Sequence, residues 1–434
     1  MPLCRTVKCS SHSSNPLGLQ VITLFFYFCC LLTYSWFFVN PDQAIKIFIF
    51  SAMLAFAVCC GNFQRLLENK RLLILPATML AFGLLQVLWV HIFKQPGTPF
   101  LGAYRSYQNA GKVMIFAAVV VTALSIRPPM SLIISRIINF LFILMALAIY
   151  AWVSYKYFSV NSINMTNYRV SLGFQLATGT AYSLTLMALL ASQALLCFRK
   201  KIAIPLYFIH FALSFFAITL TQTRAAILVY PLLGISLFLL HYRHDRLILI
   251  SATVAFLVLG LLAMLPLKPM LEKRYANFQT DLHSYNNNNN SKTSIGARFA
   301  MQEAGMIAGE ASPFGQSLEQ RSSTIKAAAR QDPSLNGAVI YLNVHLHNEL
   351  IDTFSLKGIL GTILLLGFYI AAGYTAYTQR NIVLFIVTGA IAIYGLSDLL
   401  LYAKGGALSS ILALCLALML VPSAPREPIH DQKN

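Results

Sequence analysis

The stretch Asn343–Gly361, NVHLHNELIDTFSLKGILG, holds the residues of this chain best suited to acid–base chemistry. It ends a long hydrophilic segment and runs directly into an apolar one, so His347 is expected where water-exposed protein meets a membrane. A histidine ring can gain or lose a proton near physiological pH, and few other groups in this segment can do so. The sequence therefore marks His347 as the candidate general base.

His345 lies two residues before His347, which raises metal binding as an alternative. On a helix the two rings would point to different sides, whereas in extended chain they would share a face and could bind a metal together. Acidic partners are scarce: the chain has no DxD or DD pair, and only Glu349 and Asp352 lie within three residues of each other. A magnesium site usually needs one or two well-placed carboxylates. We therefore expect a reaction that uses no metal and no other cofactor.

Arginines supply a different way to stabilise an anion. Arg224 lies in TQTRAA, between two apolar segments only a few residues apart, and its planar guanidinium can pair bidentately with phosphate oxygens. Arg298 lies in IGAR, and Arg169 and Lys112 fall at predicted span ends on the same side. Such cations can stabilise a departing phosphate without a metal. The alternative for Arg224, Arg169 and Lys112 is contact with lipid phosphates at the interface, and for Arg298 it is a solvated position on a surface helix.

The elements that must position these residues are membrane helices. The chain has 434 residues, 57% of them hydrophobic and 11% charged, whereas soluble domains carry roughly 25% charge. Because about 20 apolar residues cross a bilayer as a helix, we predict an all-α integral membrane protein with about twelve transmembrane helices. The predicted spans are Leu17–Val39, Ala44–Cys60, Leu72–Phe93, Lys112–Ile126, Leu132–Phe158, Leu176–Cys197, Ile202–Leu220, Arg224–His241, Leu247–Leu267, Leu356–Thr378, Asn381–Tyr402 and Gly405–Val421.

The distribution of basic residues predicts the orientation. The net charge is +18, and Lys and Arg stand in short runs between apolar segments, which favours anionic membrane lipids and phosphate as partners and argues against nucleic acid. One set of alternate loops is richer in Lys and Arg, so both chain ends should be cytoplasmic. The long hydrophilic segment should then lie on the opposite side, which in a bacterium is the periplasm.

This organisation divides the chain into four parts. Residues 1–267 would form helices 1–9, 268–355 one large helical periplasmic segment, 356–422 helices 10–12, and 423–434 a cytoplasmic tail. Within the hydrophilic segment we expect a helix after Pro269, a loop at Asn286–Asn290, an amphipathic helix with Ile295, Phe299 and Met306 on its apolar face, a helix over Ser317–Arg330, and a helix from near Asn343 into the tenth span.

With these features in view, the sequence resembles the O-antigen ligases. These bacterial inner-membrane enzymes move a completed polysaccharide from undecaprenyl pyrophosphate onto lipid A–core. Their superfamily signature is His followed by Asn, Ser or Gln, then nine residues, then Gly-x-x-Gly/Thr/Tyr. It is met here by His347-Asn348, nine residues, Gly358 and Gly361. The strings TQTRAA and IGAR also resemble family strings, which places Arg224 and Arg298 on the family's essential arginines.

The resemblance implies a GT-C-like helical fold and an inverting glycosyltransferase that needs neither metal nor nucleotide. It implies His347, Arg224 and Arg298 as catalytic residues, and Arg169 resembles a position proposed to hold the pyrophosphate. Asn348 and Lys112 complete the expected substrate-binding set. The expected partners are undecaprenyl-pyrophosphate-linked O-antigen, a lipid A–core acceptor and membrane lipids, at an active site that faces the periplasm.

Three rival functions stay open. An O-antigen polymerase would use the same donor, and a protein O-oligosaccharyltransferase would glycosylate a protein hydroxyl. A flippase for lipid-linked glycans is less favoured, because transporters place ionisable groups near the bilayer midplane. The candidate residues here gather at one predicted boundary of the membrane.

Overall fold

The computed structural model describes residues 17–127, 130–161, 168–174, 176–288, 291–343 and 345–420, and within these ranges the chain is helical with no strand. The predicted tail 423–434 lies outside them. The all-α prediction is confirmed. The helices that correspond to predicted spans are α1 (Leu17–Phe37), α2 (Pro41–Gly61), α4 (Ile74–Phe93), α5 (Leu101–Ile126), α6 (Leu132–Asn161), α7 (Ala177–Leu196), α8 (Lys200–Thr219), α9 (Arg224–His241), α10 (Arg246–Asn288), α14 (Glu349–Thr378), α15 (Ile382–Gly395) and α16 (Lys404–Met419).

Length and hydropathy agree with a protein that crosses the membrane several times. Nine helical stretches of the described chain are long and apolar enough to span a bilayer, and three shorter apolar stretches fall in α10, α15 and α16. Two short helices, α3 (Phe63–Glu68) and η1 (Lys70–Leu73), connect α2 to α4. The number of twelve transmembrane helices and the GT-C-like fold class stay predictions.

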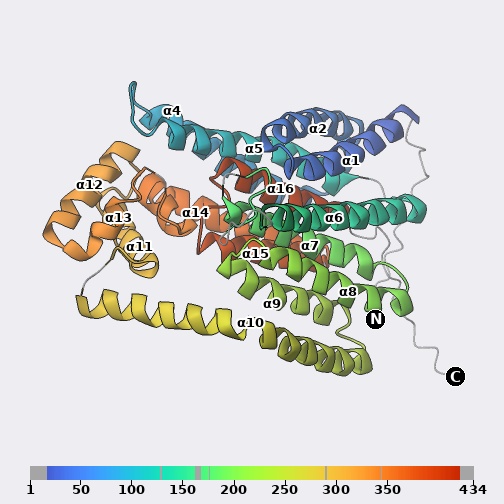
Figure 1. Cartoon of the computed structure of the whole chain (residues 1–434). Coiled ribbons are helices and arrows are strands. Elements are labelled where there is room, and N and C mark those ends of the chain that lie inside the picture. The colour runs from blue at the N-terminus through green and yellow to red at the C-terminus, as the bar shows by residue number, and fades with distance from the viewer. Residues whose placement is uncertain are drawn as a thin grey trace, which may run out of the picture.

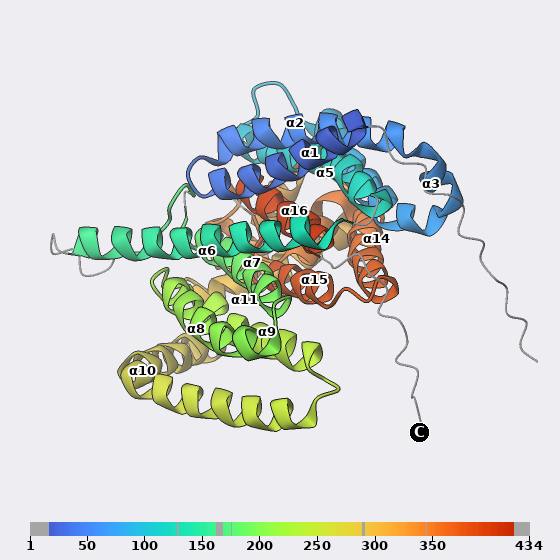
Figure 2. The ribbon, with the colours of Figure 1, turned by 90° about the vertical axis from the view of Figure 1, so that its right-hand side faces the viewer.

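The most enclosed helix is α7, of which 94% of the most apolar window is buried inside the molecule. It contacts α6, α8, α9, α15 and α16. Its sequence, ATGTAYSLTLMALLASQALL, is rich in small residues, which let neighbouring backbones approach closely in the absence of water. In Figure 2, α7, α15 and α16 lie between a layer that contains α8–α10 and another that contains α1, α2 and α5.

The hydrophilic segment forms a small helical body at one end of the bundle (Figure 1). It comprises α11 (Ser294–Ala311), α12 (Leu318–Gln331), η2 (Pro333–Leu335) and α13 (Asn336–Val339), so the helices predicted near 294–310 and 317–330 are confirmed. On α11 the predicted apolar residues Phe299 and Met306 are exposed and do not pack into the body. Small side chains pack inward instead and let α11 lie close to α13 and α14; they are Ala297, Ala300, Ala304 and Ala308.

Several predicted boundaries also need correction. The helix α10 continues without a break through the predicted boundary at 267/268 and past Pro269, and its end at Asn288 takes in part of the predicted asparagine loop. A proline removes its own N–H and crowds the carbonyl four residues earlier, but membrane helices tolerate proline because neighbouring groups satisfy the freed backbone. The helix α5 begins at Leu101 rather than Lys112, because its polar first part, LGAYRSYQNAG, is helical although it is not apolar.

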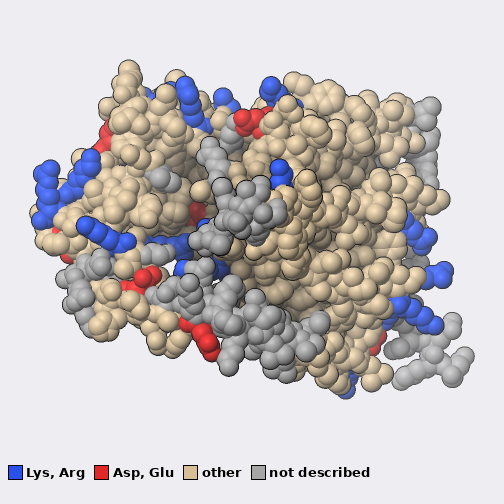
Figure 3. All heavy atoms as spheres, in the orientation of Figure 1, with Lys and Arg blue, Asp and Glu red and all other residues tan. Residues whose placement is uncertain are grey.

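The surface charge fits this arrangement. Figure 3 shows Lys and Arg side chains mainly towards the two ends of the molecule, with few on the band between them. A hollow between the α11–α13 body and the bundle also carries basic side chains on its wall. The hydrophilic body therefore adjoins a basic recess at the end of the bundle.

Candidate functional site

The two histidines lie on an irregular loop, not on a helix. The prediction of a helix from near Asn343 is wrong, because α14 begins at Glu349. The Asn348 side chain caps it by accepting hydrogen bonds from the N–H groups of Leu350 and Ile351. His347 has φ of 50°, in the left-handed region that is unfavourable for a side chain of this size. Strained residues cluster at functional sites, where the surrounding structure holds them in place.

Leu346, between the two histidines, fixes where the rings point. Its side chain is buried in the α11–α13 core, and its N–H donates to Asp352 Oδ1 at 3.2 Å. Because alternate residues of a non-helical chain can point the same way, His345 and His347 both turn to the opposite side, with ring centroids 4.4 Å apart. His345 and His347 therefore lie on one face, as expected for extended chain, although they lie in a loop and not in a strand.

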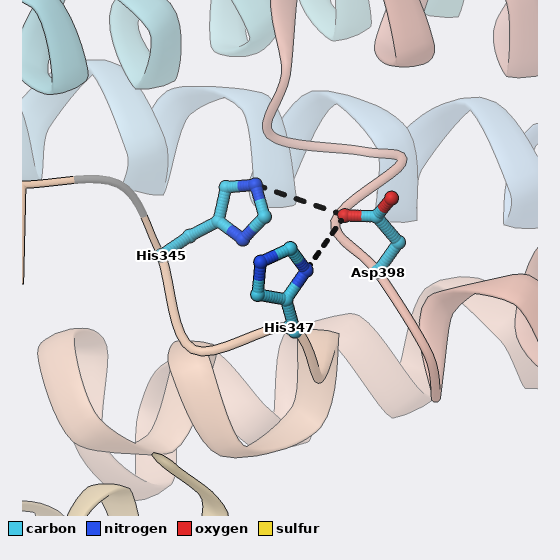
Figure 4. Close-up of side chains that lie close together, drawn as sticks. All are labelled: His345, His347 and Asp398. Carbon is cyan, nitrogen blue, oxygen red and sulfur yellow. Dashed lines mark ion pairs between the residues drawn. The ribbon is translucent and has the colours of Figure 1, made fainter. Parts of the chain in front are cut away.

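Asp398 approaches both rings from a distant part of the chain (Figure 4). Its Oδ1 lies 3.4 Å from His347 Nδ1 and 3.7 Å from His345 Nε2, and all three side chains are 17–23% exposed. Burial alone would raise the pKa of Asp398, but the imidazoles of His347 and His345 hold it below its usual value. Burial also lowers the pKa of His345, since it disfavours the imidazolium form.

Asp398 was not among the predicted site residues, because it falls inside a predicted span. We predicted the eleventh span to run through Tyr402, whereas α15 ends at Gly395 and residues 396–403 form a loop. The carboxylate of Asp398 inside a predicted span could have marked it as a functional residue, because charged residues at membrane depth usually serve a function.

A buried polar network holds the two halves of this site together. Arg321 of α12 pairs with Asp352 at 2.8 Å, and Tyr107 of α5 donates to the other carboxylate oxygen at 2.6 Å. Glu349 accepts hydrogen bonds from the Tyr369 hydroxyl at 2.7 Å and from the N–H of Leu401 at 2.6 Å. The start of α14 is thereby tied to the loop that carries Asp398.

The glycine end of the signature has a structural role. Gly358 has φ of 63°, and a Cβ at this position would lie 2.0 Å from the carbonyl oxygen of Pro313. The chain after α11 packs against this break in α14: Ile359 N–H donates to Pro313 O, and Gln316 N–H to Leu356 O. Beside it, the Lys357 ammonium lies 4.1–5.0 Å from the ring centres of Trp89, Tyr107 and Tyr402. This half of the signature therefore joins the hydrophilic body to the bundle.

Replacement of Arg321 by Met should destabilise the protein by about 3–5 kcal/mol, because Asp352 would be left as an uncompensated buried charge. Thermal unfolding in detergent measures this loss. The matched control is Arg330→Met on the exposed side of the same helix, which should have little effect. Addition of Asp352→Leu to Arg321→Met should recover part of the stability. Equal melting temperatures for Arg321→Met and Arg330→Met would contradict the network's role.

Two of the predicted arginines lie next to each other at the turn between α8 and α9. Arg169 donates from Nε to the carbonyl oxygen of Thr221 at 3.1 Å and from Nη2 to the Thr223 hydroxyl at 3.2 Å. Arg224 is the first residue of α9 and is exposed. The cap residue Thr223 makes no side-chain hydrogen bond to the first turn of α9, so the helix N-terminus adds backbone N–H groups and a partial positive charge. This corner is suited to a phosphate.

Tyr182 of α7 connects this corner to the histidine loop. Its hydroxyl lies 3.5 Å from the Ser397 hydroxyl, next to Asp398. The charges of Asp398, Arg298 and Arg169 all act on it. Arg298 is exposed on α11. Arg169, Arg298 and Asp398 therefore all lie near Tyr182.

Lys112 is placed differently. It lies within α5, well after the start of that helix, and its side chain is exposed. In the described part of the chain it forms no hydrogen bond or ion pair with any other candidate residue. The predicted start of the helix at Lys112 is wrong, because the polar first part of α5 is helical and places Lys112 in the middle of the helix.

Comparison with known proteins gives a consistent result. The family model described as O-Antigen ligase matches residues 209–366, which include Arg224, Arg298, His347 and Gly358. The chain is 31% identical over 417 residues to a protein of Escherichia coli (strain K12) named O-antigen ligase, covering 94% of this chain and 96% of that protein. It is also 32% identical over 139 residues to an uncharacterized protein of Haemophilus influenzae, covering 31% of this chain and 33% of that protein. The similarity to the E. coli protein extends over nearly the whole length of both chains, and this chain belongs to the O-antigen ligase family.

Proposed function

We propose that this chain is an inverting, metal-independent glycosyltransferase of the bacterial inner membrane. It would transfer O-antigen polysaccharide from undecaprenyl pyrophosphate to a sugar hydroxyl of lipid A–core, at the periplasmic face. The observation that supports this most directly is the contact of Asp398 with His347, in a chain whose Arg169 and Arg224 also meet at the N-terminus of α9. Such a site combines a proton acceptor with a cradle for a diphosphate.

The donor's pyrophosphate is held by Arg224 and Arg169, and Arg298 reaches it from α11. The acceptor hydroxyl oxygen attacks the anomeric carbon from the face opposite the pyrophosphate, while His347 Nε2 takes the hydroxyl proton. A new glycosidic C–O bond forms as the bond from the anomeric carbon to the pyrophosphate oxygen breaks. Undecaprenyl pyrophosphate leaves as an anion that the arginines stabilise, so the step needs no general acid.

Asp398 is a positioning residue in this mechanism. In a neutral imidazole one nitrogen carries the proton and the other accepts. The carboxylate lies 3.4 Å from Nδ1, so it favours the proton on Nδ1 and leaves Nε2 free to act as the base. When His347 becomes an imidazolium, the charge of Asp398 also stabilises it.

Replacement of Asp398 by Asn should lower kcat about 10–10²-fold. This loss is smaller than the roughly 10²–10⁴-fold that a positioned base contributes, because the base itself remains. The KM for both substrates should change little, because Asp398 touches neither. Initial rates with purified donor and acceptor lipids measure both constants. The control is Asp245→Asn. Asp245 lies in the turn between α9 and α10, where it pairs with Lys200, and its replacement should leave kcat unchanged. An unchanged kcat, or a loss seen only in KM, would rule out the positioning role.

Asn348 and Lys112, the remaining predicted substrate-binding residues, would bind groups away from the reacting atoms. The Asn348 side-chain oxygen is occupied by the α14 cap, so its amide nitrogen would be the group that donates to the acceptor sugar. Lys112 would contact a lipid phosphate from the exposed side of α5.

The choice of acceptor separates the rival functions. Purified protein is incubated with the lipid-linked polysaccharide, with and without lipid A–core. A ligase forms product only when lipid A–core is present, whereas an O-antigen polymerase lengthens the donor without it. A protein O-oligosaccharyltransferase would instead need an acceptor protein, and a flippase would form no glycosidic bond. Product formation without lipid A–core would overturn the proposal.

A further inference from the structure

The spacing of His345, His347 and Asp398 does not match direct hydrogen bonds among them. The distances from Asp398 Oδ1 to the two ring nitrogens are 3.4 and 3.7 Å, whereas N–H···O bonds usually measure about 2.7–3.2 Å. His347 Nδ1 is buried without a well-directed hydrogen bond, even though the carboxylate is its neighbour. Three donor atoms thus converge on one point without bonding fully to one another (Figure 4).

These distances match the edges of a metal coordination sphere. Zinc binds nitrogen and carboxylate oxygen at about 2.0–2.2 Å in tetrahedral geometry, which puts neighbouring ligand atoms about 3.3–3.5 Å apart. One ligand atom from each residue lies within 4.8 Å of the other two. The two distances to Asp398 are already close to such an edge, so a small movement of the histidine rings would close this set around an ion.

The donor types indicate which ion. Two imidazoles and one carboxylate suit zinc and its neighbours among the divalent transition metals, whereas magnesium and calcium prefer oxygen ligands alone. Three protein ligands leave a fourth position open, and the partial exposure of all three residues gives an ion access from solvent.

We propose that His345, His347 and Asp398 form a binding site for a zinc-class divalent cation, and that occupation of this site blocks the transferase reaction. The blocking effect rests on the proposed function, whereas the binding does not. A metal ion on Nδ1 of a neutral imidazole forces the remaining proton onto Nε2. His347 then has no lone pair with which to accept the acceptor's proton. The same residues therefore serve as a base when empty and as an inhibitory site when occupied.

Metal binding is tested first without any activity measurement. The full chain is purified in detergent, stripped with a chelator and dialysed against Zn²⁺, and bound metal is counted. Co²⁺ in place of Zn²⁺ adds a visible absorption band that reports tetrahedral nitrogen and oxygen ligation. We expect one tightly bound ion per chain, with affinity lower by at least about 10-fold in His345→Ala, since even residues that only support a ligand contribute 10–100-fold. The control is His91→Ala, an exposed histidine at the end of α4, which should bind as the wild type does.

Inhibition is tested on the same preparations, and each variant is compared with its own zinc-free rate. Zinc should suppress transfer by the wild type, a chelator should restore it, and His345→Ala should need at least about 10-fold more zinc for half-inhibition. Equal zinc binding by His345→Ala and wild type would contradict the proposed metal site. It would not contradict the proposed transferase reaction, which the His347 variants test. Zinc bound at the site with no loss of rate, or with a gain, would overturn the blocking effect and with it the role of His347 as the base.

Discussion

Replacement of His347 by Ala should reduce the rate of polysaccharide transfer by about 10²–10⁴-fold, the range that general-base catalysis contributes. The reason is geometric as well as chemical. His347 projects from a loop that Leu346 and Asp352 hold in place, and Asp398 lies beside its Nδ1. Nε2 is therefore the nitrogen that we expect to take the acceptor's proton. The measurement is the initial rate with purified donor and lipid A–core, in the presence of a chelator so that metal ions cannot contribute.

A matched variant separates lost chemistry from lost structure. His347 has φ of 50°, a conformation that Asn adopts more readily than most residues, so His347→Asn should keep the loop in place without supplying a base. Both variants should insert and unfold at the wild-type temperature, and His91→Ala should transfer at the wild-type rate. Near-normal transfer by either His347 variant would end the assignment of this residue as the base.

Much of the fold could be predicted from apolar length alone. Each of the twelve predicted segments corresponds to a helix, and the limits of α9 agree with those of the predicted eighth span, because TQT and HYRH mark sharp changes in polarity. The errors occur where a helix is polar. Leu101–Gly111 is helical, but apolar length alone predicts that this helix begins later, at Lys112.

The candidate site shows a similar division. Local strings were enough to single out His347, Arg224 and Arg298, since each lies in a short motif. Asp398 belongs to no such motif, and its role depends on the histidine loop about fifty residues away along the chain. Glu349 follows the histidine loop and holds the loop of Asp398 against α14 through the N–H of Leu401. A contact of that kind is set by tertiary packing, so no single stretch of sequence reports it.

Replacement of Arg224 by Ala should lower transfer by about 10²–10³-fold, the cost of losing one donor that stabilises developing negative charge. Because that charge grows as the pyrophosphate departs, the loss should appear mainly in kcat, with a smaller rise in the donor KM. Steady-state rates over a range of donor concentrations distinguish the two. The control is Arg199→Ala, an exposed arginine at the start of α8, at the opposite end of that helix from the turn that carries Arg224.

A conservative variant tests whether the guanidinium shape matters. Arg224→Lys keeps the positive charge beside the N-terminus of α9 but loses the planar fork that binds two phosphate oxygens at once. It should therefore recover only part of the rate lost in Arg224→Ala. Arg169 forms hydrogen bonds to Thr221 and Thr223, so Arg169→Ala should both weaken donor binding and loosen the turn that positions Arg224. Full activity in Arg224→Ala would contradict the proposal that Arg224 stabilises the departing pyrophosphate. Other residues would then have to bind the leaving group.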